Sequence, residues 1–291
     1  MCFANTHMHS TYSDGVWTPE ELIELGKQIG HKAMILTDHD TVTGYYRFQK
    51  AARKAGILTM IGTEFGCTCS FGRLHLVAVD FNPEDQGIRA LLAHNAGLQC
   101  ERSRRMFERG LERGTLRPGV TWQEVLDTFP DHDYFCNNTV FEVMVQKGIY
   151  KKEEYNDFCI NNFREPLKCD DGWKYVLPPV EECIDVVLKA GGVPVIAHPG
   201  VKGKYMFPEF AEDYVKMGVK GFEVCHPLMT EEEKKFYSDL CDKHNLYKLG
   251  GIDHDGLIGG YAETMPGHDF PPEAGYIDEE NFMKLYKREL G

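Results

Sequence analysis

Two kinds of apolar periodicity alternate over the first 65 residues. The short apolar runs in CFANTHM and KAMILTDHD each end in polar residues and predict buried strands, and ILTMIGTEF predicts a third. TPEELIELGKQIG has helical periodicity and starts with a capping box between Thr18 and Glu21. Residues 43–55 predict a second helix, and CTCSFGRLHLVAVDF predicts a hairpin that turns at Phe71-Gly72-Arg73.

The same alternation returns near residue 178. PPVEECIDVVLKAGG, residues 207–217 and TEEEKKFYSDLCDKH predict helices, while VPVIAH, VKGFEVCH and NLYKLGGIDHD predict strands. Strands that alternate with helices predict parallel strands covered by helices, in a barrel or an open sheet. Residues 84–170, between these two parts, are rich in charge and have helical periodicity. We therefore expect an α/β domain from residues 1–83 and 171–291, with residues 84–170 inserted as a helical cap.

Charge and composition narrow the class of partner. A formal net charge of −13 repels a nucleic-acid backbone unless bound cations or a local basic patch reverse the field. No apolar run approaches the roughly 18 residues of a membrane span, and the N-terminus lacks the pattern of a signal peptide. The ten cysteines are scattered without a C-x-x-C pair, which favours reduced thiols. We expect a cytoplasmic protein that acts on a small molecule, with no nucleic-acid polymer and no membrane as partner.

Histidines and acids gather where the predicted strands end. His7 and His9 are two residues apart on the first strand, so both side chains point to the same face. Side chains at the C-terminal ends of parallel strands converge on one face of an α/β barrel, where active sites form. Later strand ends add further candidates: Thr37 to Asp40 in T-D-H-D, Glu64, His198, Glu223, His226, and Asp253 to Asp255 in D-H-D. Imidazole and carboxylate ligands without thiolate suit zinc, manganese or iron(II).

These motifs resemble a known family. H-M-H-S-T-Y-S-D-G, T-D-H-D, G-T-E-F, H-L-V-A-V, A-H-P-G and the late Asp253 are similar, in this order, to the motifs of the polymerase-and-histidinol-phosphatase (PHP) family. The similarity is to its stand-alone small-molecule phosphoesterases. The resemblance implies a distorted (β/α)7 barrel with a helical insertion, and two or three divalent ions, with manganese favoured over zinc or iron.

The resemblance also implies the ligands of each ion. His7, His9, Glu64 and Asp253 would hold the first ion, and Glu64 would bridge to a second ion completed by His75 and His198. A third ion would take Asp14, His39 and a residue of the last motif. That motif is commonly D-x-H in the family, whereas this chain has Asp253-His254-Asp255, so we expect Asp255 as the ligand. Asp40 is either an orienting partner, which we favour, or a general acid.

The insertion departs from the nucleotide phosphatases of the family. Those often have an arginine and a histidine where this chain reads Cys136-Asn137-Asn138-Thr139-Val140. We therefore expect Asn138 and Thr139 among the substrate contacts, together with the cations Lys174 and Arg164 that flank the return from the insertion. Absence of the arginine favours a compact substrate over a mononucleotide, because asparagine cannot give phosphate the paired, charged hydrogen bonds of a guanidinium group.

The expected reaction is attack on phosphorus by a hydroxide that bridges the metal ions. Asp14, His39 and His226 are the catalytic candidates beside the ions. The favoured substrate is a sugar phosphate or a cyclic sugar phosphodiester, such as a ribose cyclic phosphate that is opened and then dephosphorylated. The alternatives are a nucleotide or histidinol-phosphate-type monoester phosphatase, an amidohydrolase, and a non-catalytic metal-binding module.

Overall fold

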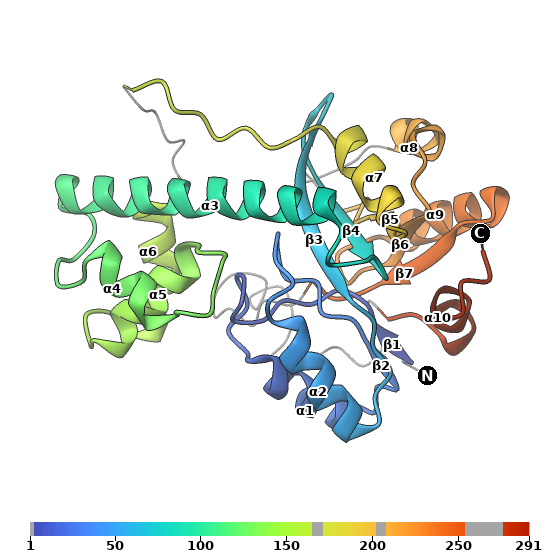
Figure 1. The fold of residues 1–291 in the computed structure, drawn as a ribbon, viewed down its shortest axis with the longest axis horizontal. Coiled ribbons are helices and arrows are strands. Elements are labelled where there is room, and N and C mark those ends of the chain that lie inside the picture. Colours follow the sequence, from blue (N-terminus) through green and yellow to red (C-terminus); the bar gives the residue numbers. More distant parts are fainter. Residues whose placement is uncertain (1–2, 165–170, 202–207, 254–275, 291) are drawn as a thin grey trace.

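The computed structural model describes residues 3–164, 171–201, 208–253 and 276–290. Within them the strands form two sheets (Figure 1). One sheet pairs β1 (Ala4–Asn5) in parallel with β2 (Ala33–Met34). The other has the order β3-β4-β5-β6-β7, with β3 (Gly62–Cys69), β4 (Gly72–Val79), β5 (Val193–Ile196), β6 (Gly221–Cys225) and β7 (Tyr247–Gly250). The first two pairings are antiparallel, and β5, β6 and β7 are parallel.

Single backbone contacts link the two sheets at both sides. On one side His39 forms a parallel bridge with Glu64 of β3. On the other, the Thr6 amide donates to the Gly250 carbonyl at the end of β7, at 3.0 Å. The mixed α/β class is confirmed. A closed seven-stranded barrel is not detected among the residues that the structure describes, where these contacts do not extend into ladders.

The strand that carries Glu64 differs from the prediction. We expected one strand ending near Glu64 and a separate hairpin arm after it. Instead β3 is continuous from Gly62 to Cys69 and pairs with β4 over its whole length. The turn lies between Cys69 and Gly72, and Gly72 takes a φ of 129°, which a side chain disfavours. Glu64 is therefore inside a strand rather than at its end.

Helices cover the strands on the outside. α1 (Pro19–Ile29) begins with the predicted capping box at Thr18 and packs against α2 (Tyr45–Ala55) beside β1 and β2. The remaining helices of this part lie around the five-stranded sheet: α7 (Val180–Lys189), the short η2 (Pro208–Phe210), α8 (Ala211–Met217), α9 (Glu231–His244) and α10 (Glu279–Tyr286). No helix in the described residues is both long and apolar enough to cross a membrane.

The inserted region has a hydrophobic core of its own. It comprises α3 (Gln86–Arg113), α4 (Trp122–Thr128), α5 (Asn137–Gln146), η1 (Lys152–Glu154) and α6 (Tyr155–Asn162). The start of α3 packs Ile88 into the core of the five-stranded sheet, whereas Phe107 near its end packs among α4 to α6. Figure 1 shows α3 running from the sheet to the cap. The domain boundary at residues 83 and 84 stays a prediction, because α3 contributes to both cores.

Candidate metal centre

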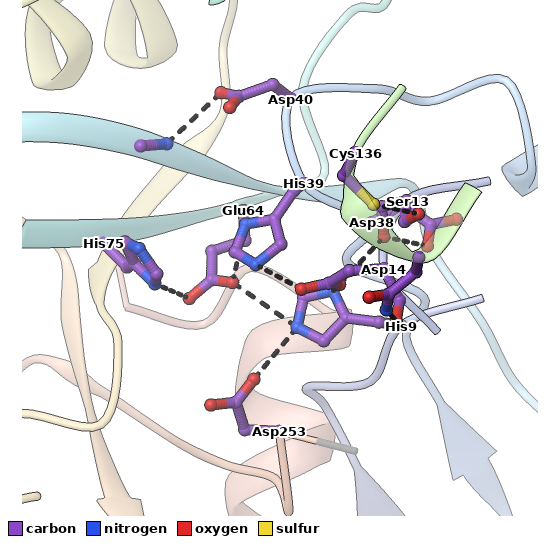
Figure 2. A network of polar contacts seen from close by, with 12 residues as sticks. His9, Ser13, Asp14, Asp38, His39, Asp40, Glu64, His75, Cys136 and Asp253 are labelled. Atoms are coloured by element: carbon purple, nitrogen blue, oxygen red, sulfur yellow. Dashed lines mark hydrogen bonds and ion pairs between the residues drawn. The ribbon is translucent and has the colours of Figure 1, made fainter. Parts of the chain in front are cut away.

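Glu64 is the centre of a cluster of histidines. Its side chain has no exposed surface, and imidazole nitrogens face both of its oxygens (Figure 2). Oε2 is approached by His7 Nε2 at 3.3 Å, His9 Nε2 at 3.4 Å and His39 Nδ1 at 3.2 Å. Oε1 is approached by His75 Nδ1 and His198 Nε2, each at 3.0 Å. A carboxylate with ligand nitrogens beside each oxygen has the arrangement of a group that bridges two cations.

Two aspartates complete the ring around this cluster. Asp253 Oδ1 lies 2.9 Å from His9 Nε2 and 3.4 Å from His7 Nε2. Asp14 lies on the other side, 3.7 Å from His9 and 3.5 Å from His39. Within the part of the chain that the structure describes, two groups have ligand atoms within 4.8 Å of one another: His7, Glu64, His198 and Asp253, and His9, His39 and Glu64.

Strand geometry explains how distant residues meet here. His7 and His9 follow β1, His39 follows β2, His198 follows β5 and Asp253 follows β7. His75 has a different origin, because it lies within β4, where it pairs with Gly66. Glu64 is two residues from Gly66, so it shares the face of His75 and is its diagonal neighbour. The rule of strand ends did not place His75, but the register of the hairpin does.

The donor set fits a divalent cation. His7 Nε2 and His9 Nε2 are 3.2 Å apart in a buried space, and Glu64 Oε2 and His9 Nδ1 are buried without a hydrogen-bond partner among the described residues. Such groups are costly to leave unpaired, and a cation bound among them would offset this cost. The set of imidazole and carboxylate without thiolate is common to several first-row metals. The described residues thus offer the ligands that a divalent-metal centre needs.

The cluster's own charges already favour carboxylates in the ionised form. Burial alone would raise the pKa of Glu64, but His7, His75 and His39 hold it well below its usual range. Burial lowers and the neighbouring acids raise the pKa of His9, with a net value of about 9. His75 behaves differently, because burial outweighs Glu64 and lowers its pKa to about 4. In the metal-free protein, His9 is therefore protonated at neutral pH and His75 is not.

Glu223 positions two of the imidazoles, a role that the sequence did not reveal. It lies fully buried in β6, with Oε1 at 2.7 Å from His7 Nδ1. Its Oε2 accepts the His198 amide at 2.5 Å. With Nδ1 bound to Glu223, His7 presents Nε2 to the cluster, as outer carboxylates commonly do for metal-ligating histidines. The available signal was an acid inside the apolar run of VKGFEVCH.

Asp38 fixes the loop that carries Asp14, a role that the sequence did not assign to it. Its two oxygens accept the Ser10 amide at 2.6 Å, the Ser10 hydroxyl at 2.7 Å and the Ser13 hydroxyl at 2.7 Å. Burial raises the pKa of this carboxyl. Gly15 is required beside it, because a Cβ there would come within 2.3 Å of the His9 carbonyl oxygen. The serines and glycine of H-S-T-Y-S-D-G therefore shape the loop.

Asp40 faces away from the cluster in Figure 2. Its Oδ1 accepts Asn95 Nδ2 at 2.7 Å and the Gly66 amide at 3.2 Å, and its own amide donates to the Glu64 carbonyl. Burial raises the pKa of Asp40 to about 6. These contacts fix the part of β3 that carries Glu64, which supports an orienting role for Asp40. Asp40, His198 and Asp253 all have positive φ, at 50°, 31° and 49°, a conformation that costs about 1–3 kcal/mol each and concentrates at functional sites.

The predicted substrate contacts occupy different surroundings. Asn138 is buried at the start of α5, where its amide donates to the Asp14 carbonyl and its oxygen accepts the Tyr155 hydroxyl. Thr139 accepts the Cys136 amide at 3.3 Å. The bond from Asn138 to Asp14 ties the cap to the loop of Asp14.

The other candidates are more dispersed. Arg164 and Lys174 are exposed and make no contact with the metal cluster among the interactions of the described residues. His226 is fully buried, with its ring 5.9 Å from that of His198. Asp255 and His254 lie outside the described residues, so the choice between them as a ligand stays a prediction.

Known proteins with similar sequences extend along almost the whole chain. It is 24% identical over 288 residues to a 3′,5′-nucleoside bisphosphate phosphatase of Chromobacterium violaceum, which covers 94% of each chain. It is 25% identical over 255 residues to a phosphoribosyl 1,2-cyclic phosphate 1,2-diphosphodiesterase of Eggerthella lenta, covering 87% of this chain and 94% of that protein. A 5′-3′ exoribonuclease of Haemophilus influenzae is 23% identical over 251 residues, with 85% and 88% covered.

The fold and the family model agree with these similarities. A Bifidobacterium adolescentis structure, described as that of a metal-dependent phosphoesterase, superposes with a TM-score of 0.77 at 23% identity and covers 99% of this chain and 96% of its own. The PHP domain model matches residues 5–117, the segment that holds His7, His9, His39, Glu64 and His75. Residues 5–117 thus match the PHP domain, and together with the named relatives this match supports a phosphoric-ester hydrolase.

Proposed function

We propose that the chain is a divalent-metal-dependent phosphoesterase that hydrolyses a small phosphorylated metabolite. The observation that carries this proposal is the buried Glu64 with five imidazoles facing its two oxygens. Phosphatase and phosphodiesterase relatives of similar length support the reaction class. The hydrogen bonds that link the two sheets further support arrangement of the seven strands as a distorted (β/α)7 barrel.

The proposed ligand sets follow the two sides of Glu64. His7, His9 and Asp253 would hold one ion with Glu64, while His75 and His198 would hold a second. Asp14 and His39 would hold a third together with Asp255. Manganese is favoured, and zinc and iron(II) are competent with the same ligands. When bound, such ions activate water and neutralise charge on the phosphoryl oxygens.

The remaining chemistry falls to the chain's own side chains. Asp14, Asp253 and His39 have 30%, 16% and 14% of their side-chain surface exposed. Asp14 and His39 are therefore placed to meet the substrate from the open side, as ligands of the third ion or, without that ion, as donors of a proton to the leaving oxygen. His226 is the third candidate, and its position behind His198 fits support of that ring.

The favoured substrate is a sugar phosphate or a cyclic sugar phosphodiester. Asn138 is occupied by the Asp14 carbonyl and Tyr155, and no arginine stands at this position to grip a nucleotide. Lys174 and Arg164 are proposed to contact distal parts of the substrate, with Asn138 and Thr139 shaping the near wall. A nucleotide substrate is the second candidate, because a relative is a nucleoside bisphosphate phosphatase. A net charge of −13 disfavours a polymer, although another relative is an exoribonuclease.

The experiment is a comparison of phosphate release from ribose phosphates, ribose cyclic phosphates and adenosine monophosphates with manganese present. The proposal expects kcat/KM to be highest for a ribose compound. A mononucleotide preferred by about tenfold or more, which corresponds to roughly 1.4 kcal/mol of transition-state binding, would reject the sugar substrate. Metal-dependent hydrolysis of amides without any phosphate release would favour an amidohydrolase, and no hydrolysis at all a non-catalytic module.

A further inference from the structure

Tyr134, in the cap segment before α5, lies beside the ring of His39. The two ring centroids are 6.3 Å apart and the ring planes differ by 22°, so the rings are stacked. His39 also stacks on His9, with centroids 4.5 Å apart. Through His39, Tyr134 is therefore a direct neighbour of the metal centre.

The chain on both sides of Tyr134 is anchored to loops of the metal centre. Asp133 accepts the Thr41 hydroxyl at 2.5 Å, and Cys136 Sγ donates to the Ser13 carbonyl at 3.3 Å. Thr41 directly follows the T-D-H-D motif, and Ser13 lies in H-S-T-Y-S-D-G. Tyr134 is thus held between two loops that carry candidate metal ligands.

The hydroxyl of Tyr134 makes no hydrogen bond with the described residues, although the residue is only 7% exposed. The hydroxyls of other buried tyrosines are paired, namely those of Tyr12, Tyr45, Tyr150, Tyr155 and Tyr247. Tyr237 Oη also lacks a partner, but it is closed off in the core of the five-stranded sheet, whereas part of Tyr134 stays exposed. A polar group buried to this extent is costly to leave unpaired.

This hydroxyl can serve as a neutral hydrogen-bond donor. A phenol is protonated at neutral pH, and burial, together with nearby acidic groups that include Asp14 and Asp40, raises the pKa of Tyr134 further. Neither of these carboxylates accepts its hydrogen among the interactions of the described residues. A phosphoryl oxygen only accepts hydrogen bonds, and charged acceptors form the stronger ones. A phosphoryl group on the open side of the metal centre would therefore provide the acceptor that Tyr134 lacks.

We infer that Tyr134 contacts the substrate and donates a hydrogen bond from its hydroxyl to a non-bridging oxygen of the phosphoryl group at the metal centre. The inference rests on the proposed function and adds a specific residue to it. Asn138 and Thr139, from the same segment of the cap, differ from Tyr134 because their side chains are already paired within the chain. The bond should form with the bound phosphoryl group as well as in the transition state, so it should affect both binding and turnover.

The test removes the hydroxyl and keeps the ring. Tyr134→Phe leaves the stacking on His39 in place, so it reports on the hydroxyl alone. Tyr150→Phe is the matched control, because Tyr150 is another cap tyrosine with 7% exposure and its hydroxyl accepts the Arg117 amide at 3.2 Å. Both variants and the wild type are loaded with manganese, and their metal content is measured. Phosphate release is then followed from p-nitrophenyl phosphate and from ribose 5-phosphate, an alkyl ester with a poorer leaving group.

Tyr134→Phe should lower kcat/KM for both esters by about 10- to 100-fold, the usual cost of losing one donor to a charged oxygen. Its metal content should match that of the wild type, and Tyr150→Phe should stay near the wild-type rate. Unchanged kcat/KM in Tyr134→Phe, or a loss of activity that follows a loss of metal, overturns the substrate contact and leaves the proposed function standing. A loss confined to the alkyl ester would place the bond at the leaving oxygen and overturn the assignment to a non-bridging oxygen.

Binding of inorganic phosphate separates the two proposals. Calorimetry with the manganese-loaded proteins, after removal of excess metal, measures the contact without turnover. Phosphate should bind about tenfold or more weakly to Tyr134→Phe than to the wild type, and Tyr150→Phe should bind it normally. Equal affinities of Tyr134→Phe and the wild type would overturn the contact even if hydrolysis were normal. A wild type that hydrolyses none of the phosphoesters would instead overturn the proposed function, with phosphate binding still deciding the role of Tyr134.

Discussion

The metal centre and the helical cap differ in how their charged side chains are balanced. At the metal centre, five imidazoles and the carboxylates of Asp14 and Asp253 converge around Glu64. In the cap, cations pair with acids of the same chain, as Arg117 does with Glu154 at 2.6 Å. The charges of the cap are thus balanced within the chain, whereas those of the metal centre would be balanced by bound cations.

This difference shows which charges indicate binding. The ion pair of Arg117 with Glu154 lies at the surface of the cap. Exposed pairs of this kind contribute little to stability and need no ligand. The acids and imidazoles that are buried together around Glu64 are therefore the ones that indicate binding.

The largest expected effect is at Glu64. Glu64→Gln removes the negative charge that faces imidazoles on both sides, so both proposed ion sites should weaken together. We expect turnover of p-nitrophenyl phosphate to fall by about a thousandfold or more, because activation of water at a metal pair is lost. Steady-state rates measured over a range of manganese concentrations test this, with Glu154→Gln in the cap as the control. Near-normal rates in the Glu64 variant would contradict a bridging role.

A smaller effect is expected at Glu223. Glu223→Gln keeps the shape but removes the charge that orients His7 and receives the His198 amide. Loss of such a partner typically lowers metal affinity by about 10- to 100-fold. Competition with a chromogenic chelator measures the affinity, and excess manganese should restore most of the rate. Failure of excess metal to restore activity would show that Glu223 acts in some way other than through the imidazoles.

The pH dependence of metal binding sharpens the contrast within the cluster. The metal-free His9 has a pKa raised to about 9, whereas that of His75 is lowered to about 4. A ligand imidazole must be neutral, so between pH 7 and 9 metal binding should release protons, and affinity should rise with pH by up to about tenfold per unit for each proton released. Above the raised pKa the rise should stop. Calorimetric titrations in two buffers of different ionisation enthalpy count the protons, and a count of zero at pH 7 would refute this charge state.

The smallest effect on catalysis is expected at Asn95. Asn95→Ala leaves the buried Asp40 carboxylate with one partner fewer, which should cost about 1–3 kcal/mol of unfolding free energy. Chemical denaturation measures the loss. Because Asp40 faces away from the cluster, kcat should change by only a few fold; a loss as large as that of Glu64→Gln would place Asp40 in the reaction itself.

Patterns among residues close in sequence predicted much of the fold and part of the candidate site. The capping box at Thr18 and Glu21 is confirmed, because it depends only on neighbours in sequence. The alternation of strands and helices gave the α/β class, and the H-x-H spacing put His7 and His9 on one face.

Features that depend on strand register and on burial could not be predicted from the sequence. The continuity of β3 is a property of its pairing with β4, so the expected strand end at Glu64 was wrong. Glu223 and Asp38 act through residues 216 and 28 positions away.

The most direct test of the account measures metal content and phosphate release on the same preparation. Elemental analysis and hydrolysis of p-nitrophenyl phosphate would be followed in the purified protein, after exhaustive chelation, and after addition of manganese. The account predicts two or more divalent ions per chain, loss of activity as they are removed, and recovery of both together. Full activity in a protein shown to be free of metal would contradict it.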